Sequence, residues 1–258
     1  MTMRRLLFGA LSLFASMGLS AVAFAADIQG KDMTIATTER PVKVEFYKAP
    51  GTAKHPTALM LHGGGGWGGA EGRIDNFRHY ASELANRGFD TYMVYYYSEA
   101  DAKGMAELPS RRTYTIGRFP AWAKLVSEVT AYAKKQPDAN GRVGLVGFSN
   151  GGNLSAHATP LDQNIDAAVV QYGGVSRVPG VQPKRFPPLL IMHGEADTQQ
   201  PMALGQKLVD QAKPLGGPVE WVTFPGEKHG FASDLSRPAA QDAFKHTVAF
   251  LDKYLKGE

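Results

Sequence analysis

The chain of 258 residues contains no cysteine, which excludes disulfide bonds, thiolate metal sites and attachment of a lipid to an N-terminal cysteine. After the first 25 residues it contains no apolar run long enough to span a bilayer. Its formal net charge is only +4, which gives no electrostatic basis for nucleic-acid binding. Internal repeats, low-complexity tracts and linkers are also absent, so we expect residues 26–258 to form a single domain.

The first 25 residues have the three parts of a secretory signal peptide. Arg4 and Arg5 form a basic start, residues 6–24 are apolar or small, and Ala23-Phe24-Ala25 has the form of a cleavage site. A retained membrane anchor is the alternative, and the small residues and the cleavage pattern count against it. We therefore expect cleavage after Ala25, a periplasmic or secreted location, and no membrane association afterwards. Loss of the two arginines, with no acid, lowers the formal charge from +4 to +2.

Strands and helices are predicted to alternate from residue 57 onward. Apolar runs predict strands at 57–61, 91–96, 143–148, 167–172, 189–192 and 219–224. Helical spacing of apolar residues predicts helices at 75–87, 120–135, 201–213 and 238–255. An antiparallel hairpin is expected before them, at 34–37 and 42–46. This order predicts an α/β fold with a mostly parallel central sheet and helices on both faces.

Two segments have weak periodicity. Residues 98–117 are polar and predict a loop or a lid, and residues 175–188 are irregular and rich in proline. The first segment carries Arg111 and Arg112, with Arg118 just beyond it. Arg112 is a candidate for holding a substrate carboxylate, although solvated surface arginines are the alternative. Trp67 and Tyr96 are further candidates for contact with substrate, because each follows or ends a strand at the edge where the site should lie.

The stretch Gly147-Phe148-Ser149-Asn150-Gly151 matches the pattern G-x-S-x-G, between an apolar strand and a segment that can form a helix. A strand that turns directly into a helix strains the central residue, and side chains on its neighbours would clash. The turn exposes Ser149 at the carboxyl end of the strand and aims helix amides at it. Ser149 is therefore a candidate nucleophile. A passive serine in a glycine-rich turn is the alternative.

A second glycine-rich stretch, His62 to Gly69, directly follows the predicted strand 57–61. So many glycines let a backbone approach a ligand closely with its N–H groups turned inward. A flexible hinge is the alternative, but the later Ser149 favours an oxyanion loop of the HGGG type.

An activated serine needs a base, and the base needs an acid that fixes its tautomer. The order Ser, Asp, His along an α/β-hydrolase chain is met by Ser149, Asp197 and His229, each just after a predicted strand. Glu195 is an alternative acid. The other histidines fit the base role less well, and His193 in particular precedes Asp197 and suggests a structural turn.

These motifs resemble the dienelactone hydrolase family of α/β-hydrolases. The resemblance covers about residues 40–255 and rests on four stretches, at 61–64, 147–152, 191–197 and 224–231. It implies triad roles for Ser149, Asp197 and His229. It also implies an oxyanion hole made by the backbone N–H groups of Asn150 and of Gly64 or Gly65.

This chain departs from the family's namesake enzymes at two points. They use a cysteine nucleophile where this chain has Ser149, and they carry a glutamate in the loop after the first parallel strand, where this chain has glycine. Both departures favour a secreted carboxylesterase over an enzyme for the dienelactone itself.

The sequence thus predicts a secreted serine hydrolase that cleaves carboxylic esters or lactones, small molecules, through an acyl-enzyme intermediate. No metal or organic cofactor is expected, because serine hydrolysis needs none and no residues have the spacing of a metal site. Two alternatives stay open. One is a non-catalytic ligand-binding protein on the same scaffold, and the other is a small peptidase of the same fold.

Overall fold

The computed structural model describes residues 27–69, 74–107, 111–176, 178–180 and 182–257. The predicted signal peptide and its cleavage site lie outside these residues. Within the described ranges, no helix is both long and apolar enough to cross a membrane.

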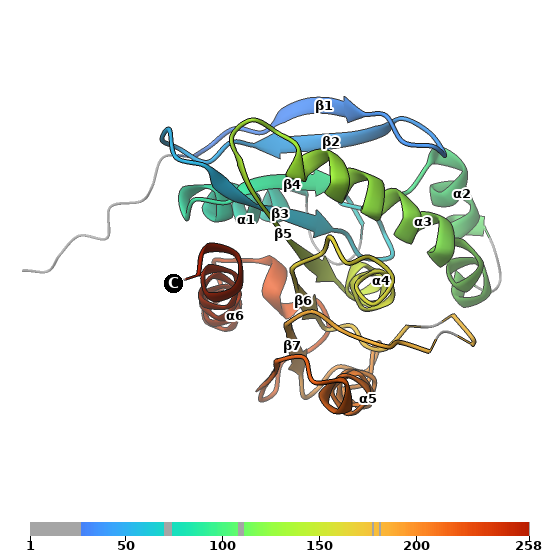
Figure 1. Ribbon diagram of the computed structural model, residues 1–258. Helices are drawn as coiled ribbons and strands as arrows, with labels where there is room; N and C mark the ends of the chain where they lie inside the picture. Colours follow the sequence, from blue (N-terminus) through green and yellow to red (C-terminus); the bar gives the residue numbers. More distant parts are fainter. Residues whose placement is uncertain (1–26, 70–73, 108–110, 177, 181, 258) are drawn as a thin grey trace, which may run out of the picture.

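In the described part of the chain, eight strands form one sheet in the order β1-β2-β4-β3-β5-β6-β7-β8 (Figure 1). β1 pairs antiparallel with β2 and β2 with β4, whereas every other neighbouring pair is parallel. The strands are β1 (Lys31–Ile35), β2 (Val42–Tyr47), β3 (His55–Leu61), β4 (Asp90–Val94), β5 (Ala139–Phe148), β6 (Ala167–Gln171), β7 (Leu189–Gly194) and β8 (Val219–Phe224). The predicted α/β-hydrolase architecture, a mostly parallel sheet, is confirmed.

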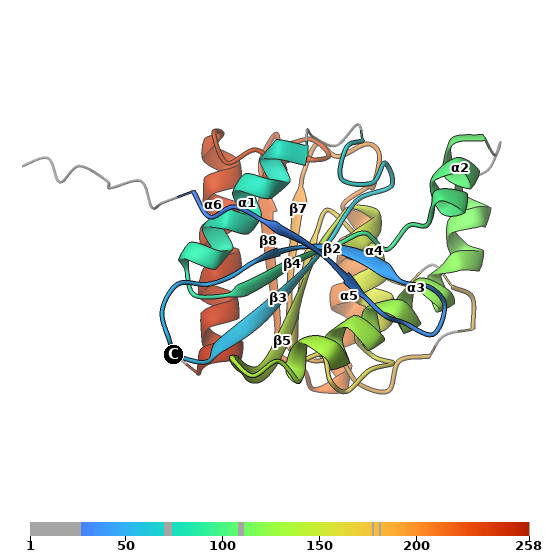
Figure 2. The same ribbon diagram turned by 90° about the horizontal axis from the view of Figure 1, so that it is seen from above.

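Helices cover both faces of the sheet (Figures 1 and 2). The helices are α1 (Ile74–Asn86), α2 (Glu99–Glu107), α3 (Arg111–Lys134), α4 (Asn150–Ala158), α5 (Ala203–Ala212) and α6 (Pro238–Leu251), with shorter helical turns at 213–215, 231–233 and 252–256. α1 and α6 lie on one face, and α3, α4 and α5 lie on the other (Figure 2). This arrangement is the one that alternating strands and helices predict.

The buried side chains form two cores, one on each face of the sheet. Alternate side chains of a strand point to opposite faces. Leu59 and Leu61 of β3 therefore belong to the core under α3, α4 and α5, whereas Ala58 and Met60 belong to the core under α1 and α6. All residues of β3 are buried, as a central parallel strand requires. The candidate site at the carboxyl edge of the sheet thus lies next to a fully buried central strand.

The segment 98–117 differs from its prediction as a loop or lid. It forms helix α2 and the first turns of α3, and α3 runs through Pro120 instead of beginning there. The apolar signal is weak because few side chains of this segment reach a core. Its helices are instead held by polar contacts and by Phe119, which is fully buried. The first strand also lies earlier than predicted, at Lys31–Ile35, because its register is set by pairing with β2.

Candidate active site

Ser149 occupies the tight turn between β5 and α4. Its φ of 54° and ψ of −111° lie in a region that side chains other than glycine rarely adopt. A Cβ at Gly147 would lie 2.3 Å from the carbonyl oxygen of Gly151, and a Cβ at Gly151 would lie 2.2 Å from that of Leu61. Both flanking glycines are therefore required by close backbone contact, which is the steric reason expected from the G-x-S-x-G pattern.

The ends of three strands bring Ser149, His229 and Asp197 into contact. The Ser149 hydroxyl lies 2.8 Å from Nε2 of His229, and Nδ1 of His229 lies 2.7 Å from Oδ2 of Asp197. His229 follows β8 and Asp197 follows β7, so the parallel neighbours place both beside the turn after β5. In this arrangement the imidazole can accept the serine proton while its other N–H donates to the carboxylate. We call these residues the hydrogen-bonded trio.

Backbone amides hold the Asp197 carboxylate in place. Its Oδ1 accepts hydrogen bonds from the N–H groups of Gln199 and Gln200, at 2.9 and 2.8 Å. His193 is buried and donates from Nε2 to the carbonyl oxygen of Gln200 at 2.6 Å, which ties the turn to β7. Glu195, the alternative acid, is exposed and instead accepts a hydrogen bond from Thr223 at 2.9 Å. The geometry therefore favours Asp197 over Glu195 as the partner of His229.

Sequence reasoning missed three residues that surround the trio. Gln200 donates from Nε2 to the Ser149 hydroxyl at 3.4 Å, and Asn153 donates to the side-chain oxygen of Gln200 at 3.2 Å. The ring of Tyr172 meets the His229 ring edge-on at 5.0 Å, and its φ of 37° marks a second strained turn. No motif points to Gln200 or Asn153. The glycine pair directly after Tyr172 was the available signal for a close turn.

The glycine-rich loop is supported by His62, as its position in the sequence suggests. The His62 ring is buried, stacks on Tyr96 at 3.9 Å and donates from Nδ1 to the carbonyl oxygen of Gly63 at 2.8 Å. Burial lowers the pKa of His62 to about 4, so the imidazole is neutral at pH 7. The loop then turns through a hydrogen bond from the N–H of Gly66 to the same carbonyl oxygen, at 3.2 Å.

One predicted oxyanion donor, Asn150, directly follows Ser149. Asn150 is the first residue of α4, and the N–H groups in the first turn of a helix have no acceptor within that helix. The close contact of Gly151 with the carbonyl oxygen of Leu61 packs this turn against the start of the glycine loop. Gly64 and Gly65 follow in that loop. Their role as oxyanion donors stays a prediction.

A pocket of about 400 Å³ adjoins the glycine loop. Its wall consists of His62, Gly64, Gly65, Gly66, Trp67, Tyr95, Tyr97, Ser98, Glu99, Ala102 and Met105. Trp67 lies in this wall, and its contact with substrate stays a prediction. Arg112 is the second residue of α3, but its side chain lies outside the described part of the structure, so its role stays a prediction.

Tyr96 does not line the pocket, which differs from the expectation that it contacts substrate. It is fully buried beneath His62 and donates its hydroxyl to the His62 carbonyl oxygen at 2.7 Å. Its neighbours Tyr95 and Tyr97 form the wall instead, because successive residues in an extended chain point in opposite directions. The Tyr97 hydroxyl accepts a hydrogen bond from the Asn150 side chain at 3.0 Å, which connects the pocket to the Ser149 turn.

Comparison with known proteins finds similarity along most of the chain. The model of the dienelactone hydrolase family matches residues 45–255. A human protein named as a carboxymethylenebutenolidase homolog is 26% identical over 242 residues, which cover 84% of this chain and 91% of the relative.

Solved structures show the same fold. The dienelactone hydrolase from Anabaena variabilis has a TM-score of 0.68 at 18% identity, with 89% of this chain and all of that chain covered. Esterase 2 of Thermogutta terrifontis, phosphorylated by paraoxon, has a TM-score of 0.65 at 20% identity, with 87% and 94% covered.

Proposed function

The chain belongs to the dienelactone hydrolase family and is a hydrolase of ester bonds, and on this premise we propose that it cleaves carboxylic esters or lactones with Ser149 as nucleophile. The observation that carries the proposal is the unbroken contact from the Ser149 hydroxyl through His229 to Asp197. The strained backbone of Ser149 supports it, since such strain is found where the structure around it holds a functional side chain in place.

The proposed reaction has two steps. The Ser149 oxygen attacks the ester carbonyl while Nε2 of His229 takes its proton, and the charged imidazole is stabilised by Asp197. Collapse of the tetrahedral intermediate breaks the bond to the alcohol, which leaves with the proton from His229. Water, deprotonated by the same imidazole, then attacks the acyl-enzyme and releases the acid and the free Ser149 hydroxyl. A lactone follows the same course, with alcohol and acid in one product.

The backbone amides of Asn150 and of Gly64 or Gly65 are proposed to hold the negative oxygen of the intermediate. Removal of one such donor costs about 3–4 kcal/mol in well-studied hydrolases. Gln200 contacts the Ser149 oxygen directly, so we assign it a positioning role before attack. The step requires neither a metal nor an organic cofactor. Among the described residues, no group of three or more histidine, aspartate and glutamate side chains is placed to hold a metal ion.

A fluorophosphonate probe tests the nucleophile. The Ser149 oxygen should form a bond to phosphorus as fluoride leaves, so that the intact protein gains the mass of one adduct. Ser149→Ala should abolish both the adduct and hydrolysis of a simple acetate ester. Ser155→Ala is the matched control, because Ser155 lies in α4, the helix that follows Ser149, and donates its hydroxyl to the Gly151 carbonyl oxygen at 2.9 Å. Labelling of Ser149→Ala at the wild-type level would reject the proposal.

We also propose that the protein is exported and cleaved after Ala25, on the basis of the signal-peptide pattern. Expression of the full chain in a bacterium with a periplasm should yield a periplasmic protein whose first residue is Ala26. Recovery of the uncleaved chain from the cytoplasm would contradict the proposal.

A further inference from the structure

The pocket beside the glycine loop has one wall that does not belong to the sheet. We name as the α2 wall the residues Tyr97 and Ser98 together with Glu99, Ala102 and Met105 of helix α2. Figure 2 shows α2 beside the first turns of α3 and away from the strands. The volume of the pocket, about 400 Å³, lies within the range of small-molecule sites. What holds α2 against α3 therefore sets the shape of this pocket.

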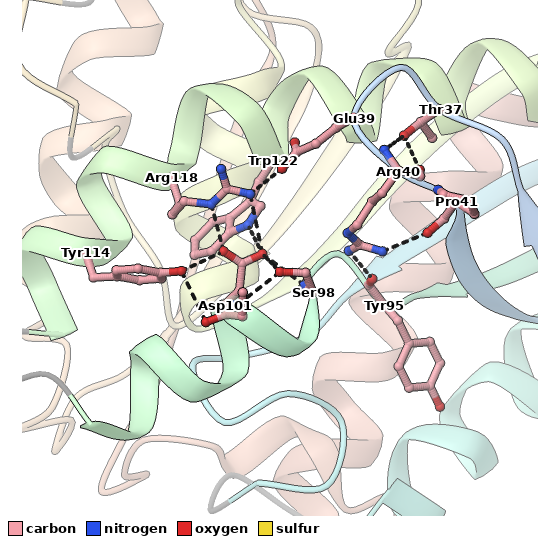
Figure 3. A network of polar contacts seen from close by, with 11 residues as sticks. Thr37, Glu39, Arg40, Pro41, Tyr95, Ser98, Asp101, Tyr114, Arg118 and Trp122 are labelled. Carbon is pink, nitrogen blue, oxygen red and sulfur yellow. Dashed lines mark hydrogen bonds and ion pairs between the residues drawn. The ribbon is translucent and has the colours of Figure 1, made fainter.

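A single buried carboxylate, Asp101, joins α2 to α3 (Figure 3). It accepts hydrogen bonds from Nε of Arg118 at 2.7 Å, from the Tyr114 hydroxyl at 2.9 Å and from Nε1 of Trp122 at 3.1 Å. Its Oδ2 also accepts from the N–H and the hydroxyl of Ser98, both at 2.9 Å. The Ser98 hydroxyl oxygen in turn accepts from the N–H of Asp101 at 3.0 Å, which caps the start of α2. Donors from α3 and from Ser98 thus converge on one side chain that is 1% exposed.

The charge of Asp101 is retained in this position. Burial alone would raise the pKa of the carboxyl group, but hydrogen bonds from Arg118, Ser98 and Trp122 outweigh burial and lower the pKa to about 2. Loss of a hydrogen-bond donor would leave the buried charge of Asp101 unpaired, which costs free energy. The junction therefore favours the one arrangement of α2 and α3 that keeps all of the donors in place.

The contact continues from α3 toward the hairpin loop that follows β1 (Figure 3). Arg118 also pairs with Glu39 of that loop. The adjacent Arg40 donates to the carbonyl oxygen of Tyr95 at 3.0 Å, just before the α2 wall begins. Asp101 is therefore connected, through Arg118, to the hairpin loop.

Two close contacts set the distance between the helices. A Cβ at Gly104 would lie 2.7 Å from the ring of Tyr114, so the ring packs directly on the α2 backbone. The Thr115 hydroxyl lies 3.3 Å from the sulfur of Met105, a residue of the pocket wall. A change in the α2–α3 contact is thus transmitted to the pocket through Met105.

We propose that this pocket receives an uncharged apolar group of the ester, and that Asp101 is the positioning residue that fixes its α2 wall and hence the size of group accepted. This inference rests on the proposed hydrolase function. The wall is formed by the rings of Trp67, Tyr95 and Tyr97 and by Met105, which suit an aromatic or short alkyl group. Of the described wall residues, Glu99 is the acidic one, and its charge disfavours an anionic group.

Steady-state kinetics on two ester series test the positioning role. One series varies the acyl group from acetyl to benzoyl with a constant alcohol, and the other varies the alcohol with constant acetyl. The wild type should prefer the larger group in at least one series. Asp101→Asn, which keeps the shape of the side chain and removes its charge, should reduce that preference about tenfold, through KM for the larger ester. Its kcat for the smallest ester should stay within about twofold of wild type, because the substitution alters only the hydrogen-bonded junction around Asp101.

Matched variants separate positioning from loss of folding. Lys103→Ala changes an exposed residue of α2 and should leave the preference unchanged. Gly104→Ala keeps Asp101 but pushes α2 from Tyr114, and it should reduce the preference as Asp101→Asn does. Gly104→Ala also tests the inference if Asp101→Asn fails to fold. Equal loss of activity on small and large esters in both folded variants, or an unchanged preference in both, would overturn it.

The charge preference is tested with a neutral ester and a matched ester that carries a second, free carboxylate. The wild type should favour the neutral ester, and Glu99→Gln should narrow the difference severalfold. The wild type could instead prefer the anionic ester and lose this preference in Arg112→Ala. That result would overturn the inference that the pocket receives an uncharged group. If the wild type hydrolyses no ester in a Ser149-dependent way, the proposed hydrolase function fails. This outcome is distinguishable from failure of the pocket inference, in which esters are hydrolysed but the preference among them differs from the expected one.

Discussion

The hydrogen-bonded trio and the α2 wall both adjoin the glycine loop, but different forces hold them. The trio stands on the ends of β5, β7 and β8, and the turn at Ser149 is fixed by direct backbone contact between Gly151 and Leu61. The α2 wall rests on a side-chain junction around Asp101, outside the sheet. The proposed nucleophile and its partners thus stand on the sheet, whereas the pocket proposed to select the substrate depends on a few polar side chains.

This difference predicts that substitutions in the two regions have separate effects on activity. A change in the trio should remove the reaction for all esters alike. A change in the α2 wall should alter which ester is preferred and leave the reaction of the smallest ester intact. The following variants test that separation.

The largest effect is expected from Asp197→Asn. The amide cannot stabilise the charged imidazole and favours the wrong tautomer of His229, so kcat should fall about ten-thousand-fold, as it does for the same change in a serine protease. The preference between small and large esters should not change. Glu195→Gln is the matched control and should retain activity, because Glu195 lies on the surface beside Thr223. A larger loss in Glu195→Gln than in Asp197→Asn would show that the acid has been misassigned.

A smaller but still large effect is expected from Gly151→Ala on stability. Its Cβ would lie 2.2 Å from the Leu61 carbonyl oxygen, and overpacking of this kind costs about 3 kcal/mol or more. Gly117→Ala, in α3, should instead stabilise the protein by up to about 1 kcal/mol, because its Cβ meets no atom within 4 Å and alanine favours a helix. Urea unfolding measures both. Equal stability of the two variants would contradict the explanation that close backbone contact requires glycine at position 151.

The pH dependence of stability tests whether His62 is buried and neutral. His62 supports the glycine loop, which adjoins both regions. Burial lowers its pKa from 6.5 to about 4, so the unfolded chain binds more protons between these values. Stability should therefore fall as the pH drops from about 6.5 toward 4, by about 2 kcal/mol between pH 7 and pH 4.5. His62→Asn retains a donor toward the Gly63 carbonyl oxygen and should lose this part of the pH dependence. Identical pH dependence in the two proteins would contradict a buried neutral His62.

Most of the fold follows from local patterns in the sequence. The apolar run at 57–61 and the helical spacing at 75–87 reflect burial in the two cores, so both elements lie within two residues of their predicted bounds. The turn at Ser149 also follows from local sequence, because its glycines are demanded by contacts that recur wherever a strand turns directly into a helix.

The α2 region could not be predicted in the same way. Asp101 is polar, and its burial depends on donors from Tyr114, Arg118 and Trp122, which lie 13 to 21 residues away in the chain. Similarly, Gln200 contacts Ser149 only because β7 lies two strands from β5. Such positions follow from tertiary contacts, which leave no periodic signal in a single sequence.

Transfer of a carbamoyl group tests the central claim most directly. An aryl carbamate should acylate the nucleophile, release one equivalent of phenol and leave an adduct that hydrolyses slowly. We expect mass spectrometry to find one carbamoyl group, on the peptide that contains Ser149, in proportion to the lost esterase activity. A carbamoyl group on any other residue, or full inhibition with Ser149 unmodified, would contradict the account.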